Sequence, residues 1–256
     1  MDYDVPDAIR VKEDGPVRIV TLTRPEQLNA VNDELHHALA HVFPQLSQDA
    51  DARVAVITGE GRAFSAGGDF DLLDRMSKDR AVRRDTLTEG REIVLNMVRC
   101  RIPVIAAVNG PAVGLGCSVI ALSDVVYMAE SAYLSDPHVT VGLVAADGGP
   151  VSWPLHTSLL LAKEYAFTGD RITAARAAEI GLANHVCPDG EALSAALATA
   201  HKVAALPPQA VEATKRVLNL HLERAILATI DFALAAENES FDTPELRTNV
   251  ERFLKR

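Results

Sequence analysis

Apolar residues recur along the first half of the chain in patterns that predict several β-strands. In Val17–Arg24 β-branched residues alternate with polar ones, as in a half-buried strand. Residues 54–61 and 102–110 begin with continuous apolar runs, which are typical of strands buried on both faces, and 124–131 resemble them. Pro103 is expected near the start of its strand, because proline cannot donate a hydrogen bond to a sheet.

Between these segments, apolar residues at helical spacing predict helices. The first helix is expected at residues 32–46, a longer one at 83–100, and a third that opens near Gly116. The apolar face of the first helix consists of Leu35, Leu39, Val42 and Phe43. Strands that alternate with helices in this way indicate an α/β fold.

After about residue 190 the pattern becomes helical, with little strand signal. Helical patterns occupy residues 191–206, 208–222 and 223–241, and Pro207 and Pro208 separate the first two. We therefore expect a core region at residues 1–190. A helical region at residues 191–256 would cover a site and bind a neighbouring subunit.

Composition narrows the classes of function. The chain has 256 residues, is 48% hydrophobic and carries a formal net charge of −10, which disfavours nucleic acids and anionic membranes as partners. Its longest apolar runs are too short to span a bilayer. The acidic N-terminal residues lack the apolar stretch of a secretory signal, so we expect a cytoplasmic protein.

Neither the cysteines nor a group of histidines indicates a metal centre. Cys100, Cys117 and Cys187 are widely spaced and form no CxxC motif, which favours buried free thiols in a reducing compartment. The other group consists of His36, His37 and His41 on the first predicted helix. For these histidines we favour solvated side chains, with a metal site as the alternative.

Two glycine-rich turns, at residues 62–73 and 106–122, carry the main chemical signal. Each follows a predicted strand and precedes a predicted helix. Glycine permits positive φ and close approach, and amides at a helix start lack internal acceptors. If the turns converge, two N–H groups meet one oxygen and form an oxyanion hole; a purely structural turn is the alternative. Neither turn has the spacing of a P-loop or of a dinucleotide fingerprint.

Five segments, in this order, resemble the crotonase (enoyl-CoA hydratase/isomerase) superfamily over roughly residues 17–188. The segments are RPEQLNAV, AFSAGGDFDLL, IPVIAAVNGPAVGLG, SDVVYMAESAYLSDP and TGDRITAARAAEIGLANHV. The resemblance implies a spiral of ββα units, a C-terminal helical trimerisation region, and homotrimers or hexamers built as dimers of trimers. It also implies an acyl-CoA substrate, with coenzyme A as part of the substrate and no other cofactor.

By position, the resemblance assigns the two oxyanion-hole amides to Gly68 and Leu115. Leu115 stands where the family usually has glycine, but a backbone N–H serves whatever the side chain. The coenzyme A contacts implied by the resemblance are Ala66, Gly68, Gly114 and Lys215. Asp71 occupies a position where the family often has a lysine, so one usual contact to coenzyme A is missing.

The resemblance also implies two catalytic glutamates, and both are replaced here. Ser118 stands at the first position, where its hydroxyl could orient water, and His138 at the second. With an ordinary pKa of about 6.5, His138 would be neutral and basic near pH 7. Asp147 follows in the loop that borders the reacting centre in the family. It is expected either to pair with His138 or to cap a helix that begins near Gly149.

We therefore expect an enoyl-CoA hydratase/isomerase-family enzyme in which His138, and Asp147 with it, replaces the usual glutamate. A His–Asp pair here also resembles the β-diketone hydrolases of the superfamily, so a retro-Claisen hydrolase of a β-diketone or β-ketoacyl-CoA is an alternative. The loss of both glutamates leaves a third possibility, an acyl-CoA-binding subunit without turnover.

Overall fold

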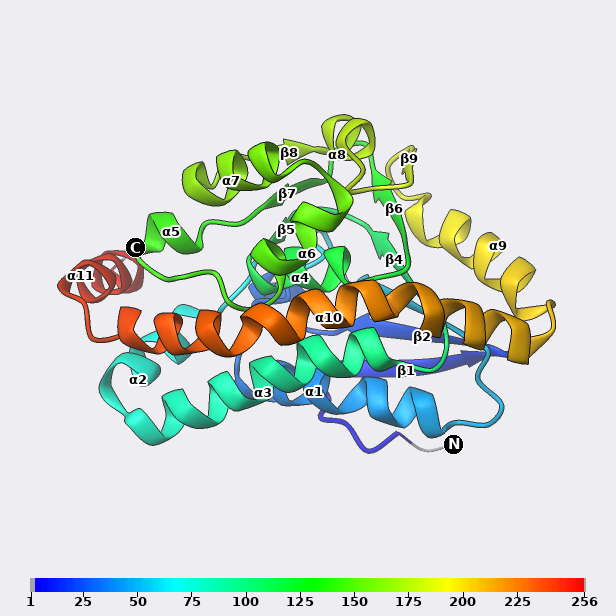
Figure 1. Ribbon diagram of the computed structural model, residues 1–256, viewed down its shortest axis with the longest axis horizontal. Coiled ribbons are helices and arrows are strands. Elements are labelled where there is room, and N and C mark those ends of the chain that lie inside the picture. The colour runs from blue at the N-terminus through cyan, green and yellow to red at the C-terminus, as the bar shows by residue number, and fades with distance from the viewer. Residues whose placement is uncertain (1–2, 256) are drawn as a thin grey trace.

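The computed structural model describes residues 3–255, so the outermost residues of the two expected regions, 1–2 and 256, lie outside it. A six-stranded sheet forms the centre of the fold (Figure 1). In spatial order its strands are β1 (Ile9–Asp14), β2 (Val17–Leu22), β3 (Val54–Gly59), β4 (Val104–Val108), β6 (Val125–Ala129) and β9 (His185–Cys187). The hairpin β1–β2 is antiparallel and the remaining pairs are parallel.

Helices cover both faces of this sheet, which explains the continuous apolar runs. In β3, Val54 and Val56 share a cluster with buried alanines of α9 (Ala192–Ala204). The alternate residues Ala55 and Ile57 join a larger cluster with α1 (Asp33–Gln48) and α3 (Arg80–Arg99). Since successive side chains of a strand point to opposite faces, a strand covered on both sides must be apolar throughout.

A second, three-stranded sheet carries the loops of the candidate site. Its strands, in order, are β5 (Ala112–Val113), β7 (Tyr133–Ser135) and β8 (Ile172–Thr173). The other helices are η1 (Pro25–Gln27), α2 (Phe70–Lys78), α4 (Leu115–Ala121), α5 (His138–Val141), α6 (Gly149–His156), α7 (Leu159–Thr168), α8 (Ala174–Ile180), α10 (Pro208–Ser240) and α11 (Pro244–Leu254). The expected α/β class is confirmed.

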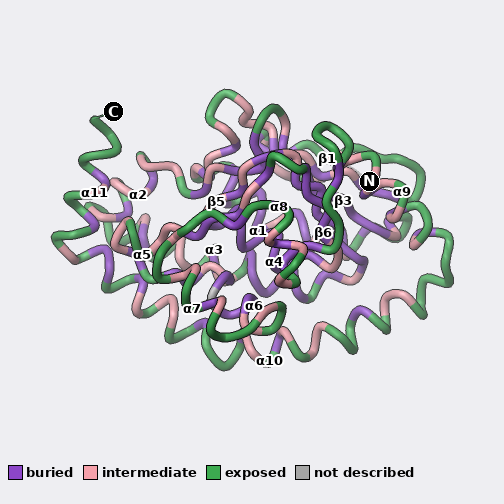
Figure 2. The backbone as a smooth tube through the Cα atoms, turned by 90° about the horizontal axis from the view of Figure 1, so that it is seen from above, coloured by how far each residue is buried: buried purple, intermediate pink, exposed green. Residues whose placement is uncertain are grey.

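The C-terminal region is helical as expected, but its divisions differ. The two patterns at 208–222 and 223–241 form a single 33-residue helix, α10, which packs along α3 and against α6. The last helix, α11, packs on α2 and was not predicted (Figure 1). Figure 2 shows buried strands at the centre, whereas buried and exposed residues alternate along α9 and α10. In the part of the chain that the structure describes, no helix is long and apolar enough to cross a membrane.

One buried ion pair fastens the start of the sheet to the end of α1. The guanidinium of Arg18, in β2, is 1% exposed, and its Nε donates to Asp49 Oδ2 at 2.8 Å. The Tyr3 hydroxyl donates to the same oxygen at 2.6 Å. Burial opposes the charged form of Asp49, but these two hydrogen bonds outweigh it and lower the pKa of Asp49 to about 2. The carboxylate therefore stays ionised in the interior and depends on Arg18.

We expect Arg18→Ala to lower the free energy of unfolding by about 3–5 kcal/mol, because it leaves the Asp49 carboxylate buried without a counter-charge. The matched control is Arg10→Ala, which breaks the exposed 3.0 Å pair between Arg10 and Glu60. That change should cost less than about 1 kcal/mol. Urea denaturation of both variants measures the difference, and similar losses in the two would contradict this view of Arg18.

Candidate active site

The first glycine turn follows β3 and contains Gly68. Gly67 has φ of 84°, which glycine adopts without strain. The neighbouring amides are used inside the fold: Ala66 N donates to Leu28 O (2.9 Å), Gly67 N to Ser65 Oγ (3.2 Å) and Asp69 N to Val31 O (3.0 Å). Among the described residues, the amide of Gly68 has no such acceptor. Asp69 then caps α2, as its carboxylate accepts from Asp71 N.

The second turn, between β5 and α4, has the same property. Gly114 caps α4 with φ of 51°, and its own amide donates to Ser135 O at 3.0 Å. Leu115 is the first residue of α4, so its N–H has no acceptor within the helix. The Leu115 amide is thus the counterpart of the Gly68 amide in the first turn.

The two turns are in contact at glycines, which have no side chain to keep them apart. A Cβ at Gly67 would lie 2.9 Å from Val113 O, and one at Gly116 would lie 2.7 Å from Ser65 Cβ. Neither distance is possible for a real side chain, so both glycines are required by the contact. Gly68 and Leu115 consequently border one cavity.

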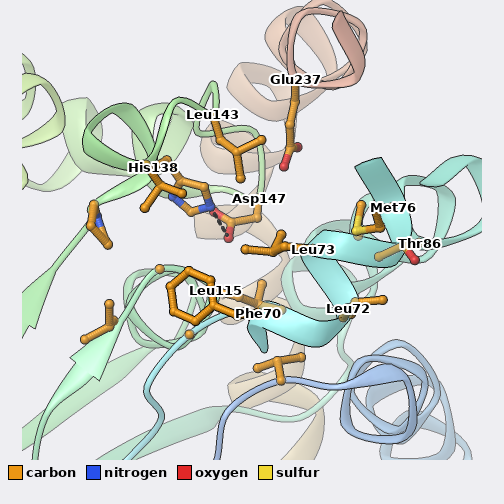
Figure 3. A pocket seen from close by; sticks show the side chains of 18 of the residues that line it. Phe70, Leu72, Leu73, Met76, Thr86, Leu115, His138, Leu143, Asp147 and Glu237 are labelled. Atoms are coloured by element: carbon orange, nitrogen blue, oxygen red, sulfur yellow. Dashed lines mark ion pairs between the residues drawn. The ribbon is translucent and has the colours of Figure 1, made fainter. Parts of the chain in front are cut away.

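This cavity has a volume of about 310 Å³ and a largely apolar wall. Side chains from α2, α3 and the loop after α5 contribute to the wall. They include Leu87 of α3 and Leu72, Leu73, Met76 and Leu143, which Figure 3 labels. Phe70 and Phe253 stack at 4.4 Å between ring centroids and also line the cavity, so α11 forms part of its boundary. Ala66 and Gly114, both expected to contact coenzyme A, line it as well.

A cluster of acidic and basic side chains interrupts the apolar wall. His138 is the first residue of α5, and its Nδ1 faces Asp136 Oδ1 in a short hydrogen bond. On the other side of the ring, Nε2 lies 3.4 Å from Asp147 Oδ2 (Figure 3). The second oxygen of Asp147 accepts a hydrogen bond from Ser118 Oγ at 2.7 Å. The imidazole is therefore held between two carboxylates.

This arrangement fixes the charge of His138. Burial by itself would lower the pKa of His138, but the negative charges of Asp136 and Asp147 outweigh it and raise that pKa to about 10. Burial raises the pKa of Asp147, although the positive charge of His138 opposes the shift. The pKa of Asp136 is lowered: burial opposes the shift, and the charge of His138 outweighs it. The expectation of a neutral His138 near pH 7 is therefore wrong, because the ring is an imidazolium.

Two of the alternatives raised by the sequence are decided by these contacts. Asp147 does not cap α6; the residue at that cap is Gly148, and no side chain bonds there. Ser118 is fully buried and does not border the cavity, so its hydroxyl orients Asp147 rather than water.

Lys215 lies elsewhere in the fold. Its ammonium is buried and donates to Ile102 O at 2.8 Å and to Asp124 Oδ2 at 2.6 Å. Asp124 in turn accepts from the amide of Val104 at the start of β4. The position predicted to contact coenzyme A therefore anchors α10 to the sheet, and its charge is already neutralised inside the protein.

Sequence reasoning missed three residues of the cavity region. Asp136 is 2% exposed and sits behind His138; it stands in the same SDPH motif, where an acid two positions before the histidine was the available signal. Glu237 borders the cavity from α10, far away in sequence. His36, expected in solvent, is buried, borders the cavity and has Nδ1 2.9 Å from Glu89 Oε2.

Asp136, His138 and Asp147 also have ligand-type atoms within 4.8 Å of one another. The two imidazole nitrogens point in different directions, and each already faces a carboxylate. Such a geometry suits a protonated imidazole better than one metal ion shared by all three residues. The expectation that the site uses no metal remains a prediction.

Comparison with known proteins places this geometry in a family. Residues 12–256 match the family model described as enoyl-CoA hydratase/isomerase. The chain belongs to this family. The crystal structure of an enoyl-CoA hydratase/isomerase from Mycobacterium paratuberculosis is 63% identical, with a TM-score of 0.96, covering 98% of this chain and 100% of that one. The resemblance to the crotonase superfamily is thereby confirmed.

Other members of the enoyl-CoA hydratase/isomerase family differ in their reactions. The 2,3-dehydroadipyl-CoA hydratase of Escherichia coli (strain K12) is 34% identical over 94% of this chain and 92% of its own length. The mitochondrial Delta(3,5)-Delta(2,4)-dienoyl-CoA isomerase of Homo sapiens is 33% identical over 91% of this chain and 74% of its own length. Family membership therefore does not identify the reaction, which has to be inferred from the residues that line the cavity.

We expect His138 to titrate near pH 10 when followed by NMR of ¹³C-labelled histidine, with its signal assigned by its loss in His138→Gln. Asp136→Asn should lower this pKa, because it removes the largest charge that favours the imidazolium. Since the folded pKa lies above the ordinary value of 6.5, the stability contributed by His138 is complete below pH 6.5 and is lost as pH rises through 10. Asp170→Asn, at an exposed aspartate, is the control, and a wild-type pKa near 6.5 would refute the assignment.

Proposed function

We propose that the chain acts on an acyl-CoA thioester and stabilises the enolate that forms when a proton leaves the acyl group. Support comes from Gly68 and Leu115, which border one cavity and whose amides have no internal acceptor in the part of the chain that the structure describes. The hydratase and the isomerase described above are both named for coenzyme A thioesters. Enolate formation places negative charge on the thioester oxygen, and two preorganised donors in a dry site stabilise that charge.

In this proposal Asp147 accepts the proton. Its raised pKa makes it a stronger base than an ordinary aspartate, and it borders the cavity. The imidazolium of His138 is already protonated, so it holds Asp147 in place and offsets the negative charge that develops nearby. Ser118 fixes the second oxygen of Asp147, and Asp136 fixes the far side of the ring.

Proton transfer along the acyl chain fits these residues better than addition of water. The resemblance implies two water-holding glutamates, and Ser118 and His138 stand at their positions. The Ser118 hydroxyl is buried away from the cavity, and both nitrogens of His138 face carboxylates. We therefore place isomerisation of an unsaturated acyl-CoA ahead of hydration.

A second candidate is hydrolysis of a C–C bond in a β-diketone or β-ketoacyl thioester. The 3.4 Å approach of His138 Nε2 to Asp147 Oδ2 favours it, since an imidazole–carboxylate pair can activate water and then protonate the departing carbanion. This route needs a neutral imidazole in one step. With a pKa of about 10, His138 is rarely neutral at pH 7, so we rank this candidate second.

The expectations about assembly and surroundings remain part of this proposal. We propose a homotrimer or a dimer of trimers, supported by exposed apolar side chains such as Leu160 on α7 (81% exposed) and Phe232 on α10 (80% exposed). The coenzyme A of the substrate is the only cofactor proposed, and the proposed location is the cytoplasm.

The test of function is an assay of the purified protein on a panel of thioesters: saturated, 2-enoyl, 3-enoyl and 3,5-dienoyl acyl-CoA, together with β-ketoacyl-CoA and a β-diketone. We expect conversion of an unsaturated thioester and exchange of its C2 protons with D₂O, measured by mass spectrometry. Cleavage of the diketone alone would select the second candidate. If calorimetry detects acyl-CoA binding but no compound is converted, the hypothesis of an acyl-CoA-binding subunit without turnover is favoured.

Variants of Leu115 test the oxyanion hole through the backbone. Leu115→Pro removes the N–H at the first position of α4, where proline is compatible with a helix. We expect kcat to fall by about 10²–10³-fold. Leu115→Ala keeps the N–H and loses only the side chain, so its kcat should fall much less. Melting curves of both variants establish folding, and equal losses in kcat would contradict a role for this amide.

A further inference from the structure

Glu237 is a carboxyl group that the site described so far does not use. It projects from α10 into the cavity, toward the side of the wall that holds Asp147 and His138 (Figure 3). Leu234, one helical turn earlier, borders the same cavity, so this face of α10 is a cavity wall. Only 8% of Glu237 is exposed.

The lack of a partner distinguishes Glu237 from the other buried Asp, Glu, Lys, Arg and His side chains. Each of the others is paired: Arg18 with Asp49, Arg83 with Asp242, Lys215 with Asp124, Glu223 with Arg99 and Arg216, His36 with Glu89, and Asp136 with His138. Across residues 3–255, no hydrogen bond or ion pair joins the carboxyl group of Glu237 to another side chain or to the backbone.

An unpaired ionised carboxylate is unstable in such surroundings. Burial raises the pKa of Glu237 to about 8, with the charges of Asp147 and Asp136 adding to the effect and that of His138 opposing it. The group therefore carries its proton at neutral pH and meets the cavity as a carboxylic acid. Opposite it, Asp147 is stabilised as a carboxylate by the imidazolium, so the cavity holds one acid and one base.

We propose that Glu237 is a catalytic residue, the acid that gives a proton to the acyl chain after Asp147 has removed one; this assignment rests on the proposed function. Support comes from the placement of the two carboxyl groups, on separate elements around one apolar cavity. An acyl chain in this cavity would pass both groups.

For a 3-enoyl thioester the step balances as follows. Asp147 takes a proton from C2, and the electrons of that C–H bond form the C2=C3 bond by way of the enolate held by the two amides. The former C3=C4 electron pair takes the proton of Glu237 and becomes a C4–H bond. The product is a 2-enoyl thioester, and transfer of a proton from Asp147 to Glu237, directly or through water, restores the site.

The experiment follows deuterium in both the recovered substrate and the product of a 3-enoyl-CoA in D₂O, using the full-length protein. In Glu237→Gln, which keeps the size of the side chain, we expect C2 exchange by Asp147 to continue. Deuterium at C4 and net isomerisation should fall by about 10²-fold or more. Asp147→Asn should lose both signals. Glu239→Gln, at an exposed glutamate on α10, should behave as wild type.

Glu237→Leu separates this role from a structural one. Removal of an unpaired buried acid should leave the melting temperature equal or higher while C4 deuteration is lost. C4 deuteration in Glu237→Gln within about twofold of wild type would overturn the role of Glu237 and leave the proposed function intact. Wild-type protein that exchanges no C2 proton of any thioester in the panel would overturn both.

Discussion

The imidazolium of His138, held between two carboxylates, is the interaction on which the charge pattern of this site depends. Without the ring between them, neither Asp136, which is buried behind it, nor Asp147, in the cavity wall, would be stable as an anion. The ring in turn stays protonated only because both carboxylates are close. Because the ring remains positive, Asp147 can face the cavity as a base, while Glu237, which has no ion-pair partner among the described residues, stays neutral.

Backbone geometry supplies the complementary half of the site. The two donor turns touch at glycines, and the amides of Gly68 and Leu115, two residues that border the cavity, have no internal acceptor among residues 3–255. A similar constraint applies behind His138, where a Cβ at Gly149 would lie 2.7 Å from Asp136 Oδ2. Small residues in these loops therefore allow neighbouring segments of the chain to approach one another closely.

Much of the fold followed from periodicity, and the exceptions have physical reasons. The strands β2, β3, β4 and β6 were readable because burial on one or both faces imposes an apolar pattern. β1 escaped notice because it is an edge strand with mostly charged, partly exposed residues. α10 was divided in two, although its sequence after Pro208 contains no glycine or proline to end a helix.

The site was only partly readable for a different reason. The spacing of His138 and Asp147 within one loop suggested their contact, and the contact exists. The burial and the charge of the site residues could not be predicted from the sequence. The Ser118 hydroxyl was therefore expected to orient water, and His138 was expected to be neutral. No local sequence pattern marks Glu237 as a site residue, because its place at the cavity depends on how α10 packs in the folded protein.

The continuity of α10 has a consequence for how distant substitutions act. Lys215 and Glu237 belong to the same helix, about 33 Å apart along its axis at 1.5 Å per residue. Near the start of α10, the buried ammonium of Lys215 hydrogen-bonds to Ile102 and Asp124 beside the sheet. Near its end, the carboxyl group of Glu237 borders the cavity. Because α10 is one continuous helix that packs along α3 and against α6 between these two residues, a substitution that shifts the helix near Lys215 should also displace Glu237, although the two side chains are far apart.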